Sequence, residues 1–215
     1  ALYIKDELNY DTFLKDADRI YQVNISGNFG GEEIEGAITP PPVGAALMED
    51  FQGIESYTRI FQPGDVMISY KKDDIASKYF TESQVLAVDS NFLDIFRFEA
   101  LHGNSSDALS APHTIVLTEE MAQKYFNSID VVGQFLLYGN EKVPYKVTSV
   151  LKNIPAQSSL QFDFLVPMQT YSVVEYFNWS WIWLNVNTYV KVSESLAANP
   201  QTIQKIASQT PEMVK

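Results

Sequence analysis

Few side chains in this sequence have the type and spacing that catalysis or metal binding requires. The two histidines, His102 and His113, are eleven residues apart and lie outside any His-Glu-x-x-His pattern, so a zinc site would need distant carboxylates. The acidic run at residues 89–94 begins like a calcium loop, but Leu93 occupies a position that needs an oxygen ligand. No serine lies in a Gly-x-Ser-x-Gly turn, no glycine-rich phosphate loop follows a strand, and the chain has no cysteine. We therefore predict a chain that is not an enzyme and has no cofactor or metal site.

Two groups of residues are candidates for a contact surface instead. The three tryptophans, Trp179, Trp181 and Trp183, are spaced two apart, and on a strand this spacing would place their rings on one face. A long strand is predicted over residues 181–192. Such a face is either a platform for sugar rings, lipid or a hydrophobic partner, or part of the core, and the core is favoured because large aromatic side chains are usually buried. The second group is Glu32, Glu33 and Glu35, in a glycine-bounded acidic loop at residues 30–36.

One strand, one helix and one hairpin are predicted with particular clarity between residues 113 and 155. Residues 114–117 form a β-branched and aliphatic run, and Thr118 can cap the helix that follows. Apolar residues recur on one helix face, and two further strands at residues 134–138 and 145–151 flank the turn residues Gly139 and Asn140. The predicted order is strand, helix, strand, strand, and it contains no residues suited to catalysis.

The rest of the chain mixes short helices with strands that are mostly antiparallel, so the predicted fold class is α+β. Segments rich in Ser, Asn, Ala or Pro at residues 103–112 and 153–159 bracket the clear strand-helix-hairpin segment. This arrangement predicts two lobes, one of them carried as an insertion in the other.

Composition excludes several classes of partner. The net charge of −12 and the pI near 4.5 repel a phosphate backbone, so nucleic acid is excluded as a partner. No run of eighteen apolar residues and no charged-then-apolar leader occurs in these 215 residues. Because the sequence begins at Ala1 without methionine, we expect it to be a piece of a longer protein.

Four segments together resemble the MacB-like periplasmic core domain of FtsX-type ABC transporter permeases. They occur in the order typical of that family, and they include a Tyr-Asp-x-Phe pattern with Ala-Asp-Arg-Ile-Tyr near the start and an Ile-Pro-x-x-Ser-x-Leu-x-Phe-Asp pattern late in the chain. Two loop positions depart from the usual pattern, with Asn127 in place of a glycine and Asp130-Val131-Val132-Gly133 in place of Asp-Pro-x-Gly. The four segments are ELNYDTFLKDADRIYQV (residues 7–23), AVDSNFLDIFRFEALHGN (87–104), IVLTEEMAQKYF (115–126) and VTSVLKNIPAQSSLQFDFLVPM (147–168).

The resemblance implies a two-lobed domain on the periplasmic side of a bacterial inner membrane. It implies a Porter-like, membrane-proximal lobe from residues 1–85 and 156–215, and an inserted Sabre-like lobe from residues 86–155. It further implies mechanotransmission, in which a cytoplasmic ATPase subunit hydrolyses ATP and the outer domain engages or releases a substrate or partner. The implied partners are the transmembrane helices of the same permease chain, the ATPase subunit (indirectly), a second permease protomer, and a periplasmic partner protein or lipophilic substrate.

Each function predicts a different structure. A permease domain predicts that residues 1 and 215 lie close together at one end, because both would continue into the membrane. A secreted carbohydrate- or lipid-binding module, the alternative, predicts that Trp179, Trp181 and Trp183 are exposed in one plane. A hydrolase assembled from some of the 27 acidic residues predicts a deep cleft with converging carboxylates of perturbed pKa.

Overall fold

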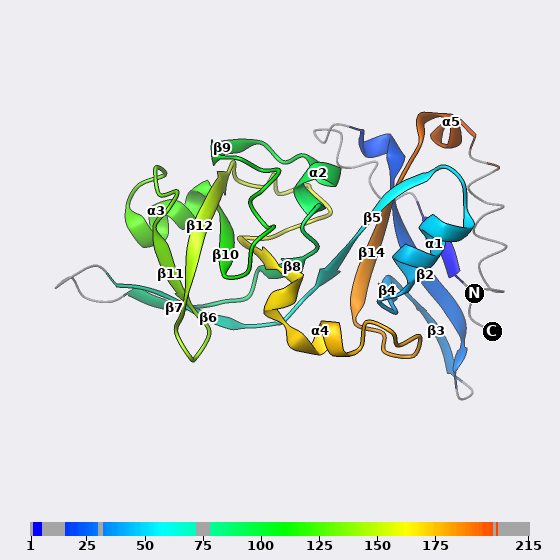
Figure 1. Ribbon diagram of the computed structural model, residues 1–215, viewed down its shortest axis with the longest axis horizontal. Helices are drawn as coiled ribbons and strands as arrows, with labels where there is room; N and C mark the ends of the chain where they lie inside the picture. Colours follow the sequence, from blue (N-terminus) through cyan, green and yellow to red (C-terminus); the bar gives the residue numbers. More distant parts are fainter. Residues whose placement is uncertain (1, 6–15, 30–31, 72–77, 200, 202–215) are drawn as a thin grey trace. The chain divides into compact units, whose positions relative to one another are not determined.

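The computed structural model describes residues 2–5, 16–29, 32–71, 78–199 and 201 (Figure 1). The chain divides into two compact units. Unit 1 consists of residues 1–61 and 172–215, and unit 2 consists of residues 62–171. Helices and mostly antiparallel strands are mixed in both units, which confirms the predicted α+β class. The prediction about the two chain ends falls on residues outside those described.

Unit 1 contains an antiparallel sheet built from segments that are far apart in the sequence. Its strands run in the order β1 (Leu2–Lys5), β2 (Ile20–Phe29), β14 (Val186–Val192) and β5 (Ile54–Phe61), with β3 (Glu32–Gly36) paired to β2 and β4 (Ile38–Thr39) paired to β14. The helices are α1 (Val43–Asp50), α4 (Ser172–Tyr176) and α5 (Glu194–Ala197). The core includes Val23, Leu47 and Val190, which are inaccessible to solvent, so strands from both halves of the chain meet in one core.

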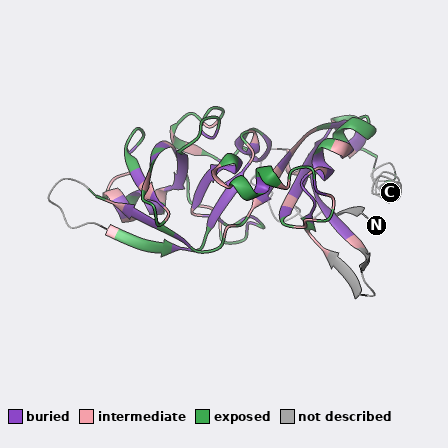
Figure 2. Ribbon diagram, turned by 60° about the horizontal axis from the view of Figure 1, so that its bottom comes forward, coloured by how far each residue is buried: buried purple, intermediate pink, exposed green. Residues whose placement is uncertain are grey.

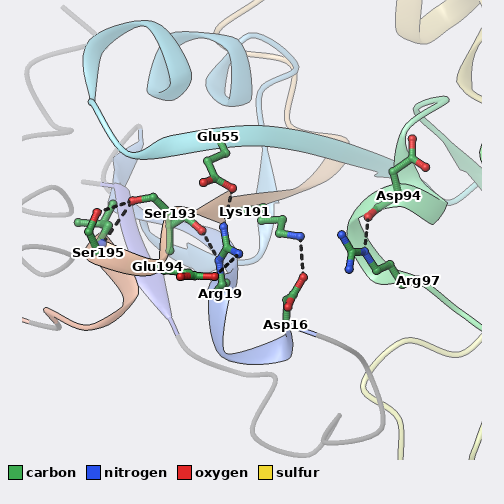
Figure 3. A network of polar contacts seen from close by, with 11 residues as sticks. Asp16, Arg19, Glu55, Asp94, Arg97, Lys191, Ser193, Glu194 and Ser195 are labelled. Carbon is green, nitrogen blue, oxygen red and sulfur yellow. Dashed lines mark hydrogen bonds and ion pairs between the residues drawn. The ribbon is translucent and has the colours of Figure 1, made fainter.

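A polar network holds the start of β2 against the end of β14 in unit 1 (Figure 3). Nε of Arg19, in the short 3-10 helix Ala17–Arg19, donates to the carbonyl oxygen of Val192 at 2.8 Å, and its guanidinium pairs with Glu55 on β5. Nζ of Lys191, on β14, lies 3.0 Å from an Oδ of Asp16. Both cations are largely buried, so each needs its partner to offset the loss of hydration.

The strands of unit 2 pair in both parallel and antiparallel directions. The order is β8 (Val85–Val88), β13 (Phe164–Pro167), β10 (Thr114–Thr118), β12 (Val143–Leu151), β11 (Phe135–Tyr138), β6 (Val66–Tyr70) and β7 (Lys78–Glu82), with β9 (Ala100–Gly103) also paired to β12. The pairs β8–β13 and β10–β12 are parallel. β8, β13 and β10 are buried along their whole length, as near-continuous apolar strands covered on both faces should be (Figure 2).

Helix α2 (Phe92–Phe96) adds an aromatic cluster to the core of unit 2. Phe92, Phe96, Phe98 and Phe162 are buried, and their neighbouring ring centroids lie 4.7 to 6.2 Å apart. Such edge-on and offset ring pairs stabilise a core beyond the area they bury. This cluster explains why the run at residues 89–94 leads into a helix packed on the core.

The predicted strand, helix and hairpin between residues 113 and 155 are confirmed. β10 ends at Thr118, whose side-chain oxygen accepts from the backbone N–H of Met121 at the start of α3 (Glu119–Phe126). α3 buries Met121, Ala122 and Tyr125, and β11 and β12 pair as antiparallel strands. Gly139 in their connecting turn has a φ of 73°, a value that glycine adopts without strain.

The boundaries of the compact units differ from those of the predicted lobes. β6 pairs with β11, and β8 and β10 both pair with β13, so residues on both sides of residues 86–155 join the same sheet. The predicted strand over residues 181–192 is too long, because β14 begins only at Val186. The predicted acidic loop also differs, since residues 32–36 form β3 and pair with β2.

Candidate contact surface

The tryptophans lie in a connection, not on a strand. We call residues 177–185, between α4 and β14, the tryptophan loop. Ser180 is buried at its centre, and its Oγ accepts from the backbone N–H groups of Ile182 and Trp183. Asn178 accepts from an Nη of Arg59 on β5 at 2.5 Å. A buried serine that accepts from amides two and three residues later forms a tight local turn, which ends the strand pattern that the sequence predicted.

The three indole rings occupy different environments. Trp181 packs against the core of unit 1, and Trp183 is half-buried between Phe177 and Phe61, with ring centroids at 5.1 and 6.3 Å. Trp179 is 74% exposed. The expected single face with three rings is therefore wrong, because only Trp179 presents most of its surface to solvent. The secreted sugar- or lipid-binding module, which required all three rings in one exposed plane, is not supported.

Other apolar side chains close to Trp179 in the sequence are exposed as well. Tyr176 is 72% exposed and Ile182 is 85% exposed, and Val173 on α4 is exposed too. We call Val173, Tyr176, Trp179 and Ile182 the exposed apolar set. The sequence did not point to Val173, Tyr176 or Ile182, because α4 ends at Tyr176 and no single helix or strand carries all four positions. Large apolar side chains concentrated in one exposed segment are typical of a surface that contacts another molecule.

The glutamates of the second predicted group lie on a different element. Glu32, Glu33 and Glu35 belong to β3, where Glu33 pairs with Asn28 and Glu35 with Ser26 of β2. Their side chains are outside the described part of the structure. β3 and the tryptophan loop are separate segments of unit 1, so the two groups remain two candidate surfaces.

Unit 2 contains a cluster of polar and charged side chains around the buried Glu82. Glu82 on β7 is almost inaccessible, and its carboxylate accepts from Nζ of Lys124 at 2.7 Å and from the Tyr125 hydroxyl at 2.5 Å. Burial and the Glu82 carboxylate raise the pKa of Tyr125, and burial with the nearby Glu82 and Glu120 raises the pKa of Asp163. The cluster ties β7 to α3, since Lys124 and Tyr125 both belong to that helix.

The two histidines are far from forming a metal site. Nδ1 of His102 lies 3.9 Å from a carboxylate oxygen of Asp130, whereas His113 is exposed and packs edge-on against Tyr145. In the described part of the chain, no three His, Cys, Asp or Glu side chains converge as a metal site would require. Nor does any described helix combine the length and apolar character needed to cross a membrane.

Comparison with solved structures places this fold among transporter domains. The chain superposes on a domain from a Porphyromonas gingivalis protein described as a permease with a TM-score of 0.70, at 24% identity, over 92% of this chain and 84% of that one. The periplasmic region of MacB from Actinobacillus actinomycetemcomitans gives a TM-score of 0.60 at 16% identity, over 91% and 84%. The extracellular domain of the noncanonic ABC-type transporter YknZ from Gram-positive bacteria gives 0.50 at 15% identity, over 82% and 86%.

At these identities the superpositions establish the fold. No curated protein sequence matches the chain. The model of the MacB-like periplasmic core domain, however, matches residues 1–209, which is nearly the whole sequence. The chain therefore belongs to the MacB-like periplasmic core domain family, the extracytoplasmic domains of ABC transporter permeases.

Proposed function

We propose that this domain transmits movement of the permease's membrane helices, driven by ATP hydrolysis in the cytoplasm, to a substrate or partner protein outside the membrane. The observation that carries the proposal is the composition of unit 1, which is built from both the first and the last part of the chain. Both connections to the rest of a permease would then leave from one unit. Relative movement of the two membrane helices would act directly on that unit.

The two units fit the division of labour expected of such a domain. Unit 1 would be the Porter-like lobe next to the membrane, and unit 2 would be the Sabre-like lobe inserted into it. Each unit is compact and has its own buried apolar residues, so we expect each to move as a rigid body. The domain itself would be non-catalytic, with ATP bound only by the cytoplasmic ATPase.

The exposed apolar set is the surface that we assign to contact with a lipophilic substrate or a partner protein. Trp179 and Ile182 are exposed. The loop that carries them is held by Trp181, which packs on the core of unit 1, and by the hydrogen bond from the N–H of Trp183 to Oγ of Ser180. An exposed aromatic residue on a firmly anchored loop loses little conformational freedom when it binds. The acidic β3 residues are a second, separate candidate for contact.

Distance measurements in the complete permease test the transmission of movement. Met48 on α1 is exposed, and the domain contains no cysteine, so Met48→Cys provides one spin-label site in each permease protomer. We expect the distance between the two Met48 labels to change when a non-hydrolysable ATP analogue binds to the ATPase. A second label at exposed Glu194, also in unit 1, provides the control, and the Met48–Glu194 distance should stay constant. A Met48–Met48 distance that ignores the nucleotide would contradict the proposal.

A further inference from the structure

Strand β7 is the last strand of the unit 2 sheet, and among the described strands it pairs only with β6. The residues at its centre, Tyr79, Phe80 and Thr81, are all exposed, and Tyr79 is 66% exposed. Natural sheet edges are usually blunted by a lysine, a proline or a bulge. These three residues include none of them.

The strand register shows which backbone groups of β7 face the open edge. The N–H of Gly139, which follows β11, donates to the carbonyl oxygen of Met67 at 2.8 Å, so Met67 on β6 directs its backbone groups toward β11. Because successive residues of a strand alternate, Ile68 directs its groups toward β7, where Phe80 is its partner. Phe80 therefore bonds inward to β6. Tyr79 and Thr81 on either side of it direct their N–H and C=O groups away from the sheet.

The charged residues at the two ends of β7 do not protect this edge. Nζ of Lys78 donates to the carbonyl oxygen of Lys124 at 2.8 Å, so the Lys78 side chain reaches toward α3. Glu82 is buried and is held by Lys124 and Tyr125. Both charges are thus directed onto the helix-covered face. The opposite face carries Tyr79 and Thr81, with exposed Met67 directly across from Thr81 on β6.

We propose that β7 pairs with β7 of a second copy of this chain, antiparallel about a two-fold axis at Phe80. In such a pair, a residue whose backbone groups point out of the sheet must lie opposite another residue of the same kind. This is possible only if the two-fold axis passes through a residue and not between two residues. An axis at Phe80 places Tyr79 opposite Thr81 of the second copy, and the reverse. All four outward N–H and C=O groups of each strand's Tyr79 and Thr81 are then bonded. An axis at Tyr79 or at Thr81 would use only half of these groups between described β7 residues.

The same register also matches the side chains. Lys78 lies opposite Glu82 of the second copy at both ends of the pair, and because both side chains keep their contacts with α3 in their own chain, no like charges are opposed across the pair. Tyr79 opposite Thr81 is a pair of an aromatic and a β-branched residue, a combination that stabilises neighbouring antiparallel strands. For a chain with a net charge of −12, a contact that brings no acidic residues together is an important requirement. This pairing does not depend on the transport role proposed above.

Disulfide trapping tests the register directly. Opposed residues in a pair that is not hydrogen-bonded have Cα atoms about 4.5 Å apart, which is within the range of a disulfide. The variant Phe80→Cys in the 215-residue chain has a single thiol, and we expect it to form covalent dimers under mild oxidation. Tyr79→Cys is the matched control, because its thiol would lie opposite Thr81 and about 7 Å or more from the same thiol of the second copy. Dimer formation by Phe80→Cys should exceed that of the control at least about tenfold.

A proline at the open edge of β7 provides a second test of the pairing. The N–H of Thr81 faces outward, so Thr81→Pro removes a bond to the second copy and leaves the β6–β7 ladder intact. Circular dichroism should show an unchanged fold, and trapping of Phe80→Cys/Thr81→Pro should fall to the control level. Equal trapping of Phe80→Cys and Tyr79→Cys, a chain that stays monomeric with Phe80→Cys, or full trapping despite Thr81→Pro would each overturn the proposal.

Discussion

At the scale of single residues, identical side chains in one short segment have different roles. Trp181 packs with the unit 1 core, Trp183 stacks between two phenylalanines, and Trp179 faces solvent. The difference comes from the turn around Ser180, not from the residue type. One tryptophan is thus available for contact because its neighbours hold the loop.

Two substitutions should separate these roles. Trp181→Ser removes a ring packed on the core, and we expect the free energy of unfolding to fall by about 2 kcal/mol or more. Trp179→Ser removes an exposed ring, so the free energy of unfolding should change by less than about 0.5 kcal/mol. Urea titrations followed by circular dichroism measure both values. A Trp179→Ser variant as unstable as Trp181→Ser would mean that Trp179 is a packing residue.

Part of this surface could be predicted from the sequence. The tryptophan cluster was identified from residue type and spacing, but its geometry was predicted wrongly. A period of two residues is compatible with a strand, and the local turn around Ser180, together with the packing of Trp183 on Phe61, decides that the segment turns before β14. Tyr176 and Ile182 were missed because an isolated apolar residue gives no sign of its exposure.

At the scale of elements, the local sequence predicted structure well wherever its signals agreed. β10, the cap at Thr118, α3 and the β11–β12 hairpin follow from propensity, capping and turn residues within a few positions. What the local signals could not provide is the order of strands in the sheet. β12 lies parallel to β10, and β6 joins β11, through pairings between distant residues.

The pairing of β9 with β12 requires a glycine at position 103. β9 ends at Gly103 against Ser149 of β12, with a φ of 86° at Gly103. A methyl group at this position would overlap the carbonyl oxygen of Thr148 and lie 2.9 Å from the Cα of Ser149. Only a residue without a side chain allows β9 to approach β12 this closely.

Replacing Gly103 should therefore lower the free energy of unfolding by more than the backbone strain of a positive φ alone. Gly139 is the matched control, because its φ is also positive but nothing lies within 4 Å of an added methyl group. We expect Gly139→Ala to lower the free energy of unfolding by about 1 kcal/mol and Gly103→Ala by about 3 kcal/mol. Chemical denaturation of both variants gives the comparison. Equal losses would argue that β9 can move away from β12 without cost.

At the scale of the whole molecule, the division into two units has consequences for stability. Each unit has its own core, so damage in one should be felt mainly there. The ion pair between the buried Glu82 and Lys124 lies within unit 2, and the Arg19 network lies within unit 1. Each provides a site for a local perturbation.

Hydrogen exchange should resolve the two units. Glu82→Ala leaves Lys124 without its counter-ion and the Tyr125 hydroxyl without its carboxylate, and we expect faster exchange of amides in β6, β7 and α3. Amides of β2, β5 and β14 in unit 1 should keep their protection. Arg19→Ala should have the reverse effect, because Val192 loses its donor. Uniform acceleration across both units in either variant would indicate a single cooperative body.

The strand register indicates that the polar network at the start of β2 would resist a pull on β2 and β14. Ile20, the first residue of β2, pairs with Lys191 near the end of β14, so tension that reaches these two strands from the two chain ends acts on the same end of their ladder. A pull in this direction would load the hydrogen bonds of the β2–β14 ladder one after another. The Arg19–Val192 and Lys191–Asp16 bonds occupy this end and would be the first contacts between β2 and β14 to bear the load (Figure 3). Unit 2 lies between the two parts of unit 1 in the chain, so a pull on the chain ends would load unit 2 only after β14 had separated from both β2 and β5.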